Sequence, residues 1–290
     1  MVTLENIVVL DEEQLHRYQQ EILSIAKDLI RICKDNDIKY SLSGGSVIGA
    51  VRHNGLIPWD DDIDINIPRE SYKKLVRVFE KELGDKYYLQ TPLTFPNLGI
   101  MVTQLRKKGT VARRKYDWNT NPCGISIDIY IVDNVFDNKL LRFVQQELSM
   151  LLSFVVSSIR TYNNRQIPKE ISNLESKPLR MGILKKTVGR LFGVIPLKYW
   201  MSLADSVNGM CNNISSKYVT IPTGRQHFNN EIQKREDILN YIQVPFEDIK
   251  VNIPKNYDAY LKKLYGGSYM TVPPKEDRES HVFLELKYKE

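Results

Sequence analysis

The sequence predicts an α/β protein, of the α+β type, in which helices flank a small mixed sheet and the C-terminal part is mostly helical. Two patterns carry this prediction. Residues 11–36 begin with acidic residues and then place apolar residues at helical spacing, which indicates an amphipathic helix. Residues 61–67, DDIDINI, alternate polar and apolar side chains, as a strand with one buried face does. Helices and strands therefore follow one another along the first half of the chain, as in a sheet covered by helices.

The other elements expected in the first half are short and clearly bounded. Pro68 ends the alternating strand, and Gly84 closes the helix that follows it. The Ile- and Val-rich segments after that helix favour further strands. These elements are a strand at 38–42, helices at 46–53 and 69–83, and strands at 98–106 and 124–132.

The second half departs from this alternation, so we place a soft domain boundary near residue 137, between parts 1–137 and 138–290. Residues 138–160 have the apolar pattern of a long helix. From about residue 217 the chain is rich in loops, with one further helix expected at 255–265.

The charge balance narrows the class of partner. The 290 residues include 41 Lys and Arg against 35 Asp and Glu, which gives a net charge of +6. This excess favours anionic partners such as nucleotides, phosphorylated glycans or an anionic membrane surface. It is too small and too dispersed to indicate nucleic-acid binding. The three cysteines lie far apart and form neither a disulfide framework nor a metal knuckle, so we expect them to be buried in a reducing compartment.

The N-terminus and the apolar stretches predict a cytoplasmic protein. The first ten residues contain Glu5 and no basic residue, unlike a secretory signal peptide. The longest charge-free apolar run, residues 148–159, has 12 residues, whereas a membrane-spanning helix needs ~20. We therefore expect no transmembrane segment.

The alternating strand is the sharpest chemical feature. Residues two apart on a strand share a face, so Asp60, Asp62 and Asp64 are expected on one side and the isoleucines on the other. Carboxylates this close repel one another and raise each other's pKa unless a cation neutralises them. Hard oxygen ligands of this kind suit Mg²⁺. The alternatives are an exposed acidic edge that discourages strand pairing and a loop of helix-capping aspartates.

A second acid, Asp128, interrupts the apolar strand GISIDIYI at 124–131. A lone aspartate in such a strand is costly unless it is paired or bound to a metal. The alternative is a side chain that accepts hydrogen bonds from neighbouring backbone amides.

A glycine turn, Gly44-Gly45-Ser46, lies between the strand at 38–42 and the helix that follows. Glycines allow the backbone to approach a ligand closely, and amides at a helix start bind anions. The Ser46 hydroxyl can add a further hydrogen bond to a phosphate. A tight structural turn is the alternative. Together, the turn and the acidic strand predict a site for a phosphate and a metal.

These residues belong to a longer stretch, SLSGGSVIGAVRHNGLIPWDDDIDINI at 41–67, that closely resembles the signature of the LicD-type phosphotransferase family. That family includes bacterial phosphocholine transferases and is related to fukutin and the fukutin-related ribitol-phosphate transferase. Three later stretches resemble further elements of the family: VTQLRKKGT at 102–110, ISIDIYIVD at 125–133 and LKKLYGGSYMTVPPKEDRESH at 261–281. The resemblance implies a nucleotidyltransferase-like catalytic core at 1–137, with the helical part at 138–290 completing the site.

The resemblance also implies roles for the acids. Asp62, Asp64 and Asp128, the third acid on a neighbouring strand, would be the catalytic residues. With Asp60 as an additional ligand they would bind Mg²⁺, with Mn²⁺ as an alternative. Asp128 would either complete the metal site or take the acceptor proton. The turn of Gly44, Gly45 and Ser46 would hold the phosphates of the donor.

The reaction that the resemblance implies transfers a phospho-alcohol. The donor would be a CDP-alcohol, with phosphocholine as the first choice and ribitol or glycerol phosphate as alternatives. A hydroxyl of a cell-surface or lipid-linked glycan, in capsule, teichoic acid or lipopolysaccharide, would attack the β-phosphorus and CMP would leave. Two other classes remain: a nucleotidyltransferase that moves NMP from an NTP, and a non-catalytic nucleotide-binding scaffold.

Further residues are candidates for contact with the donor or the acceptor. Arg106 has the planar fork of a phosphate clamp, or is a solvated charge at a strand end. Arg52 and His53 touch the phosphates or anchor the loop to the acidic strand, and Trp59 stacks on the donor or packs that loop. The candidates for substrate contact outside the core are Arg225, His227 and His281.

One stretch of the second half suggests a peripheral membrane contact. Residues 176–204 contain six basic residues and no acid, interleaved with apolar and aromatic residues. This composition suits an interfacial contact with anionic lipid, which would place the protein at the inner face of the membrane. A basic helix pair packed on the core is the alternative.

Overall fold

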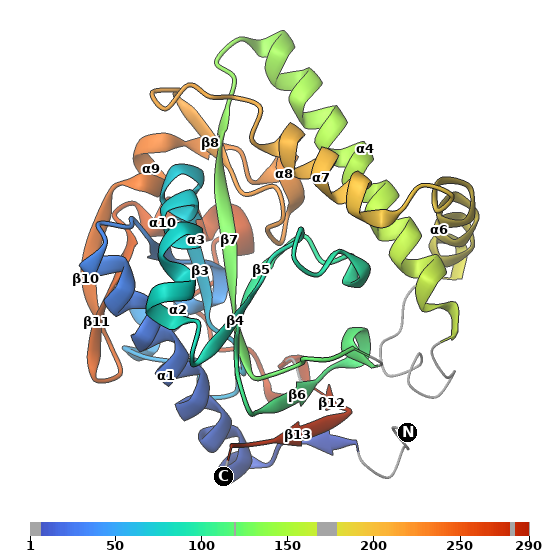
Figure 1. Cartoon of the computed structure of the whole chain (residues 1–290). Coiled ribbons are helices and arrows are strands. Elements are labelled where there is room, and N and C mark those ends of the chain that lie inside the picture. Colours follow the sequence, from blue (N-terminus) through green and yellow to red (C-terminus); the bar gives the residue numbers. More distant parts are fainter. Residues whose placement is uncertain (1–6, 119, 167–178, 279–281, 290) are drawn as a thin grey trace.

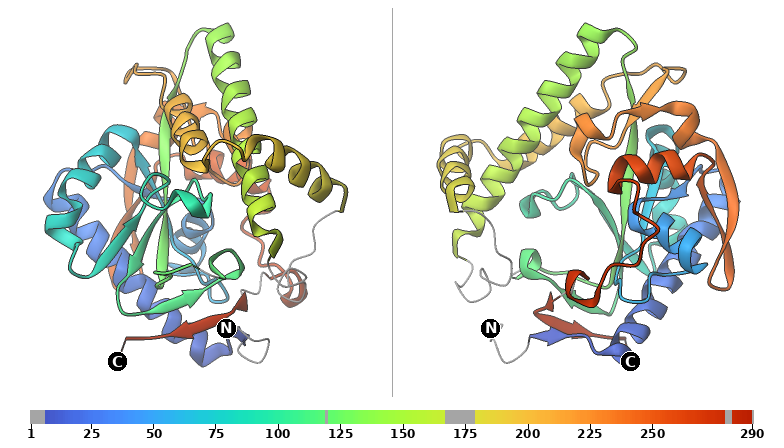
Figure 2. Two further views of the ribbon diagram at one scale, coloured as in Figure 1. Left: turned by 45° about the vertical axis from the view of Figure 1, so that its right-hand side comes forward. Right: turned by 180° about the vertical axis from the view of Figure 1, so that it is seen from behind.

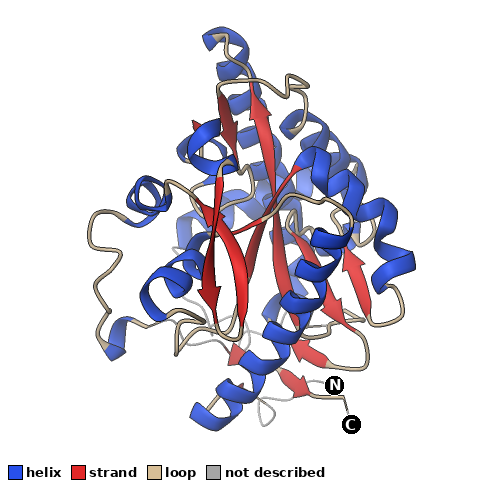
Figure 3. Ribbon diagram, turned by 90° about the vertical axis from the view of Figure 1, so that its left-hand side faces the viewer, coloured by secondary structure: helices blue, strands red, loops and turns tan. Residues whose placement is uncertain are grey.

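The computed structural model describes residues 7–118, 120–166, 179–278 and 282–289. Within them a mixed sheet runs through the molecule, with helices on both of its sides (Figure 1, Figure 3). The α/β class expected from the sequence is confirmed.

The sheet is built around one parallel pair of strands. β3 (Asp64–Pro68) and β7 (Ser126–Val135) run parallel, and the other paired strands of the sheet are antiparallel. β7 is central because its first half pairs with β3 and β5, while its last residues pair with β8. The remaining strands are β2 (Ser41–Leu42), β4 (Tyr87–Gln90), β5 (Thr103–Lys107), β8 (Tyr218–Thr220) and β9 (Gln233–Lys234), and the order is β2-β3-β7-β5-β4 with β8 and β9 continuing from β7.

α1 (Glu12–Asp35) supplies a large part of the core. Its start is fixed by a capping box: the Asp11 carboxylate accepts from the Gln14 backbone N–H at 2.8 Å, and the Gln14 side chain accepts from the Asp11 N–H at 3.1 Å. Its apolar face is fully buried, and each such side chain stabilises the fold by roughly 1.5–3 kcal/mol. That face includes Ile22, Ile25, Leu29 and Ile32.

Three shorter helices complete the core around the sheet. α2 (Gly44–His53) follows β2, and α3 (Arg69–Leu83) follows β3. α10 (Tyr257–Tyr265), from the far end of the chain, packs against α2. The elements that flank the glycine turn and the acidic strand therefore come from both halves of the sequence.

The chain leaves the sheet after β7 and returns to it as β8. α4 (Lys139–Asn163), α6 (Leu179–Phe192) and α7 (Leu197–Asn208) lie together on one side of the molecule (Figure 2). They have a small apolar cluster of their own, which includes Val156 and Met201. Because β8 pairs with the end of β7, residues on both sides of the boundary expected near 137 share one sheet.

The rest of the second part contains strands as well as helices. β10 (Tyr241–Phe246) and β11 (Ile249–Pro254) form a hairpin, and two further pairs join the chain ends to the core. These are β1 (Val8–Val9) with β12 (Val282–Phe283) and β6 (Val111–Arg113) with β13 (Glu285–Lys287); the short helices are α8 (His227–Asn230) and α9 (Arg235–Leu239).

The expected elements are present with shifted ends. The strand expected at 98–106 begins only at Thr103, because a 3₁₀ turn at Pro96–Leu98 is followed by Gly99 in a left-handed conformation (φ 63°), which interrupts an extended chain. The acidic strand pairs only from Asp64 onward, and the preceding aspartates lie in the loop that leads into it. The three cysteines are buried and unpaired, as expected.

α4 has a property that the sequence patterns did not show. Among the described residues it is long and apolar enough to cross a membrane, by length and composition alone. In the structure it is fastened to α7 by buried polar contacts: Gln145 Nε2 donates to the Asn208 carbonyl at 3.0 Å, and Ser149 Oγ donates to Asn208 Oδ1 at 2.6 Å. Isolated charges such as Glu147 interrupt the apolar sequence of this helix, so its longest charge-free run is too short to indicate a membrane span.

Candidate functional site

The parallel strands place two acids side by side. Asp64 at the start of β3 and Asp128 on β7 are register partners, and the Asp128 N–H donates to the Ile63 carbonyl at 3.1 Å. Neighbouring strands lie ≈ 4.8 Å apart, so the two carboxylates project from adjacent positions on one face of the sheet. The third acid expected on a neighbouring strand is therefore where the sequence predicts it.

The loop before β3 gathers three more carboxylates. Gln19, buried on α1, donates to the carbonyls of Ile57 at 3.2 Å and Asp60 at 2.8 Å, which holds the loop against the helix. One carboxylate oxygen from each of Asp60, Asp61 and Asp62 lies within 4.8 Å of the others. Gln19, which belongs to no sequence motif, thus holds the three carboxylates close to the start of β3.

The electrostatics of this cluster follow from crowding. Burial, and then repulsion from Asp60, raises the pKa of Asp62 well above its usual value. Burial, and then repulsion from Asp62, does the same to the pKa of Asp64, and burial raises the pKa of Asp128. Arg114 opposes this effect: its Nη2 lies 3.2 Å from Asp61 Oδ2, and its charge lowers the pKa of Asp62, Asp64 and Asp128. Arg106 also lowers the pKa of Asp128, but burial and repulsion outweigh both cations.

The glycine turn opens α2 directly against these acids. The Asp64 N–H donates to Ser46 Oγ at 2.9 Å, and the Gly44 N–H donates to Tyr260 Oη of α10 at 3.0 Å. Gly44 is left-handed (φ 48°), and a Cβ there would lie 3.0 Å from Tyr265 Oη. Only glycine fits without strain, so the turn brings bare backbone next to Asp64.

Asp128 is held from behind by a buried polar chain. Gln104 Nε2 donates to Asp128 Oδ1 at 2.8 Å, and Arg106 Nη2 donates to Gln104 Oε1 at 2.7 Å and to Asp117 at 3.2 Å. Arg106 is only 3% exposed. The prediction that Arg106 clamps phosphate is contradicted by this geometry, because its guanidinium is buried in an ion pair with Asp117; it positions Asp128 through Gln104.

Three predicted donor contacts lie elsewhere. Arg52, at the end of α2, donates to His53 Nε2 at 2.9 Å and to the Tyr269 carbonyl at 3.0 Å. The rings of His53 and Trp59 meet edge to face at 5.8 Å, and the Arg278 guanidinium lies 4.0 Å from the Trp59 ring centre. These contacts join the C-terminal segment to the end of α2 and to Trp59. Contact of these residues with a donor stays a prediction.

A pocket of about 410 Å³ joins the acids to the second half of the chain. Its wall combines the start of α2 with Asp62 and Asp64, and with Tyr130 of β7. Arg225 and His227, predicted as substrate contacts, line the same pocket from the segment after β8. His281 lies outside the described residues, so its predicted contact is untested.

Sequence reasoning missed Glu231, which also lines this pocket. Its side chain is 2% exposed; Oε1 accepts from the Gln226 N–H at 3.1 Å, and Oε2 has no hydrogen-bond partner in the described structure. Burial raises the pKa of Glu231 to about 7, against the opposing effects of that hydrogen bond and of Lys263. No motif surrounds it in the sequence, and only the return of the chain beside β7 brings it to the acids.

The donor set fits a hard divalent cation. Asp60, Asp62, Asp64 and Asp128 offer only carboxylate oxygens, and a bound cation would relieve the repulsion that helps to raise the pKa of Asp62 and Asp64. Softer nitrogen or sulfur ligands are not part of the acidic cluster among the described residues. These residues would hold the ion beside the backbone of the glycine turn.

Comparisons with known proteins match the part of the chain that carries these acids. Residues 37–150 match the family model described as LicD/FKTN/FKRP, nucleotidyltransferase domain. The chain is 25% identical over 274 residues to the lipopolysaccharide cholinephosphotransferase LicD of Haemophilus influenzae, covering 92% of this chain and 95% of that protein. It is 30% identical over 189 residues to an uncharacterized protein of Rickettsia prowazekii, covering 56% and 62% of the two chains. It is also 40% identical over 59 residues to the human ribitol 5-phosphate transferase FKRP, covering 20% of this chain and 12% of that protein.

Proposed function

We propose that this chain, whose residues 37–150 match the LicD family model, transfers phosphocholine from CDP-choline to a hydroxyl of a cell-surface glycan, in a Mg²⁺-dependent reaction that releases CMP. The single observation that supports this best is the shared pocket. It brings the start of α2, Asp62 and Asp64 together with Arg225 and His227 of the second half. Such a pocket has room for a diphosphate on one wall and an acceptor on the other.

The chain's own residues act by positioning charge. The backbone at Gly45 would approach the diphosphate, as amides at a helix start do, whereas the Gly44 N–H already donates to Tyr260 Oη. Asp62 and Asp64, with Asp60 and Asp128 nearby, would hold the Mg²⁺ ion, and Gln104 keeps Asp128 oriented. When bound, the ion would neutralise charge on the diphosphate and on the leaving CMP. Catalysis of this kind is mainly positioning and electrostatic stabilisation.

We assign proton removal to Glu231. The acceptor oxygen forms a bond to the β-phosphorus, the bond from that phosphorus to the bridging oxygen breaks, and CMP leaves with the electron pair. The hydroxyl proton passes to Glu231 Oε2, the oxygen that has no partner in the described structure. Asp128 is less suited to this step, because Gln104 already donates to it and it does not line the pocket.

The identity of the alcohol rests on the relatives. The Haemophilus protein that matches over nearly the whole chain is named as a cholinephosphotransferase, which favours choline. The FKRP match covers only 59 residues, so ribitol phosphate is the second candidate and glycerol phosphate the third. A transferase of NMP from an NTP would use the same turn and acids, and only the donor distinguishes it.

We expect CDP-choline with Mg²⁺ to raise the melting temperature of the purified protein, because a ligand that binds only the folded state stabilises it by mass action. At 100 times the Kd the gain is about 2.7 kcal/mol. CDP-ribitol, CDP-glycerol, CTP and ATP serve as parallel arms, each with and without Mg²⁺. A shift with CTP and ATP alone would replace the proposal with NMP transfer. The absence of a shift with any of these nucleotides would contradict a donor-binding site in the protein without its acceptor.

We also propose that the helices after β7 contact an anionic membrane, which would place the enzyme beside lipid-linked acceptors. Large apolar side chains are exposed on α4, α6 and α7, among them Leu151, Leu191 and Tyr199. The exposed bases Lys186 and Arg190 flank the apolar face of α6, and residues 179–204 contain no acid. Apolar area edged by cations matches the surface of an anionic bilayer.

The membrane contact predicts flotation with vesicles that contain anionic lipid and not with purely zwitterionic vesicles. The double variant Lys186→Glu/Arg190→Glu should bind at least about 25-fold more weakly, since each base near such a surface contributes ≈ 1 kcal/mol. Lys81→Glu, an exposed site on α3, is the matched control. Equal flotation with both vesicle types, or equal loss in the control, would remove this proposal.

A further inference from the structure

A second and larger cavity, of about 820 Å³, lies at the other end of the central strands. Pro68 of β3 and Val132 and Asn134 of β7 line it, whereas Asp64 and Asp128 lie at the opposite ends of those strands. Asp64 and Pro68 are four positions apart on the strand, a span of about 13 Å. The cavity is therefore separate from the acidic pocket.

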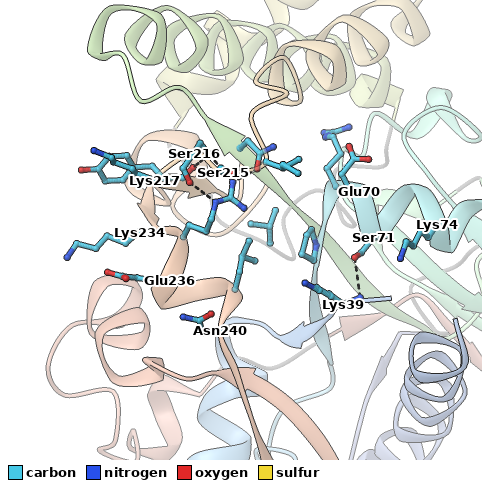
Figure 4. A pocket seen from close by; sticks show the side chains of 18 residues that line it. Lys39, Glu70, Ser71, Lys74, Ser215, Ser216, Lys217, Lys234, Glu236 and Asn240 are labelled. Carbon is cyan, nitrogen blue, oxygen red and sulfur yellow. Dashed lines mark hydrogen bonds between the residues drawn. The ribbon is translucent and has the colours of Figure 1, made fainter. Parts of the chain in front are cut away.

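The lining of this cavity is strongly cationic. Six of its residues are basic and two are acidic. Lys39 and Lys74 lie on one side and Lys217 and Lys234 on the other (Figure 4), and Lys74 also contacts Asp37 Oδ2 at 3.4 Å. One of the two acids, Glu70, already binds Lys73 at 2.7 Å. An anion that entered the cavity would meet cations on two walls.

Arg235 adds a further cation to the lining of the cavity. Its guanidinium donates to the Ser216 carbonyl, to Ser216 Oγ at 2.9 Å and to Asn134 Oδ1 at 2.6 Å, all of them neutral acceptors. Burial lowers the pKa of Arg235, as expected for a cation that is partly desolvated. Arg69 differs, because Asp133 and Asp205 neutralise it. Arg235 is thus a fixed cation whose charge a ligand could balance.

The N-terminus of α3 adds to the positive electrostatic potential of the cavity. Arg69, Glu70 and Ser71 form its first turn, and all three line the cavity. The preceding residue, Pro68, has no side chain that could accept a hydrogen bond from these amides. The positive end of a 15-residue helix therefore opens toward the lysines.

The rest of the lining is neutral. Pro68, Val132 and Leu239 provide apolar surface, and Ser215 and Asn240 provide hydroxyl and amide groups at the rim. Apolar and polar patches of this kind suit the ring and hydroxyl groups of a sugar or sugar alcohol. Nothing in the lining offers a row of stacking aromatic rings for nucleobases.

We propose that this cavity is a second substrate-recognition site, which binds a phosphate-bearing segment of a glycan. The inference rests on the proposed function in one respect, that the acceptor is a glycan. The basic side chains would hold the phosphate, and the apolar and neutral polar side chains of the lining would hold the sugar. The site would retain the polymer while another part of the same chain enters the acidic pocket.

The test measures binding without the donor, so that it does not depend on catalysis. A fluorescently labelled oligomer of six ribitol-phosphate units is titrated with the full-length protein, and binding is read as polarisation. Lys39→Glu and Lys234→Glu, on opposite walls, should each weaken binding about tenfold. The matched control is Lys250→Glu, an exposed site on β11 outside the cavity, which should bind like the wild type.

Competition distinguishes the possible sources of phosphate. Unlabelled oligomer should displace the probe at far lower total phosphate than inorganic phosphate or CMP does. Equal displacement by inorganic phosphate would overturn the assignment to a glycan. Equal weakening by Lys250→Glu, or none by the two cavity variants, would overturn the site. Asp62→Asn should bind the probe as the wild type does, because Asp62 lies outside this cavity. If the wild-type protein binds the oligomer but transfers no phosphocholine, the proposed function is contradicted and the second site still stands.

Discussion

Replacing Asp62 with Asn should abolish transfer while leaving the protein folded. Asn keeps the shape of the side chain and removes the charge that would bind the cation, so we expect kcat to fall by about 10³-fold or more, at the upper end of losses seen when one group that stabilises a transition state is removed. Asp64→Asn should behave alike, since the two acids act on the same diphosphate. The measurement is CMP release under saturating CDP-choline and Mg²⁺.

Stability separates this effect from damage to the fold. Asp62 lies among like charges that burial and repulsion already disfavour, so a neutral Asn should leave the melting temperature unchanged or higher. Asp85→Asn, an exposed aspartate in the turn before β4, is the matched control and should retain full activity. Normal turnover by either site variant would disprove the assignment of the catalytic acids.

Replacing Glu231 with Gln should lower kcat/KM by about 10²–10⁴-fold, the usual contribution of a general base. The pH dependence carries the sharper signature. A base must be deprotonated, and burial raises the pKa of Glu231 to about 7. The wild-type kcat/KM should therefore rise with pH through about 7 and level off above it. In the variant that rise should disappear.

The surroundings of Glu231 decide how this profile is interpreted. Lys263 of α10 lowers the pKa of Glu231. The other charged and titratable groups that line this pocket are Asp62, Asp64, Tyr130, Arg225, His227, Tyr260 and Tyr265. His227→Gln should therefore be measured beside Glu231→Gln, because a histidine can produce a similar rise. Glu13→Gln, exposed on α1, is the matched control. If the rise survives in Glu231→Gln and is lost in His227→Gln, the histidine is the base.

Local patterns were sufficient for the elements that position the acids. The alternation in DDIDINI and the apolar strand around Asp128 depend on side chains that face a core, and that signal lies within a few residues. The glycine turn was predictable for the same reason, because only glycine fits at Gly44. Family resemblance added the pairing of the two strands, which β3 and β7 confirm.

Partners distant in sequence were not predictable. Asp61 meets Arg114 across 53 residues, and Gln19 holds Asp60 across 41. The misassigned Arg106 shows the difficulty, because nothing near it in sequence reveals that Asp117 will neutralise it in the interior. The position of Glu231 was the least predictable. It reaches the pocket because the chain returns to β7 after about 80 residues, and no local sequence pattern encodes that return.

That return has a consequence for how such proteins diversify. The chain leaves β7 at Val135 and comes back opposite it at Tyr218, so the ends of the excursion are register partners in one ladder. An insertion whose two ends lie side by side can lengthen, shorten or be exchanged with little disturbance to the strands that carry the acids. The principal ties to be rebuilt would be a few contacts such as Arg69 with Asp205. The strands that carry the acids and the helices between β7 and β8 can therefore evolve at different rates within a single polypeptide.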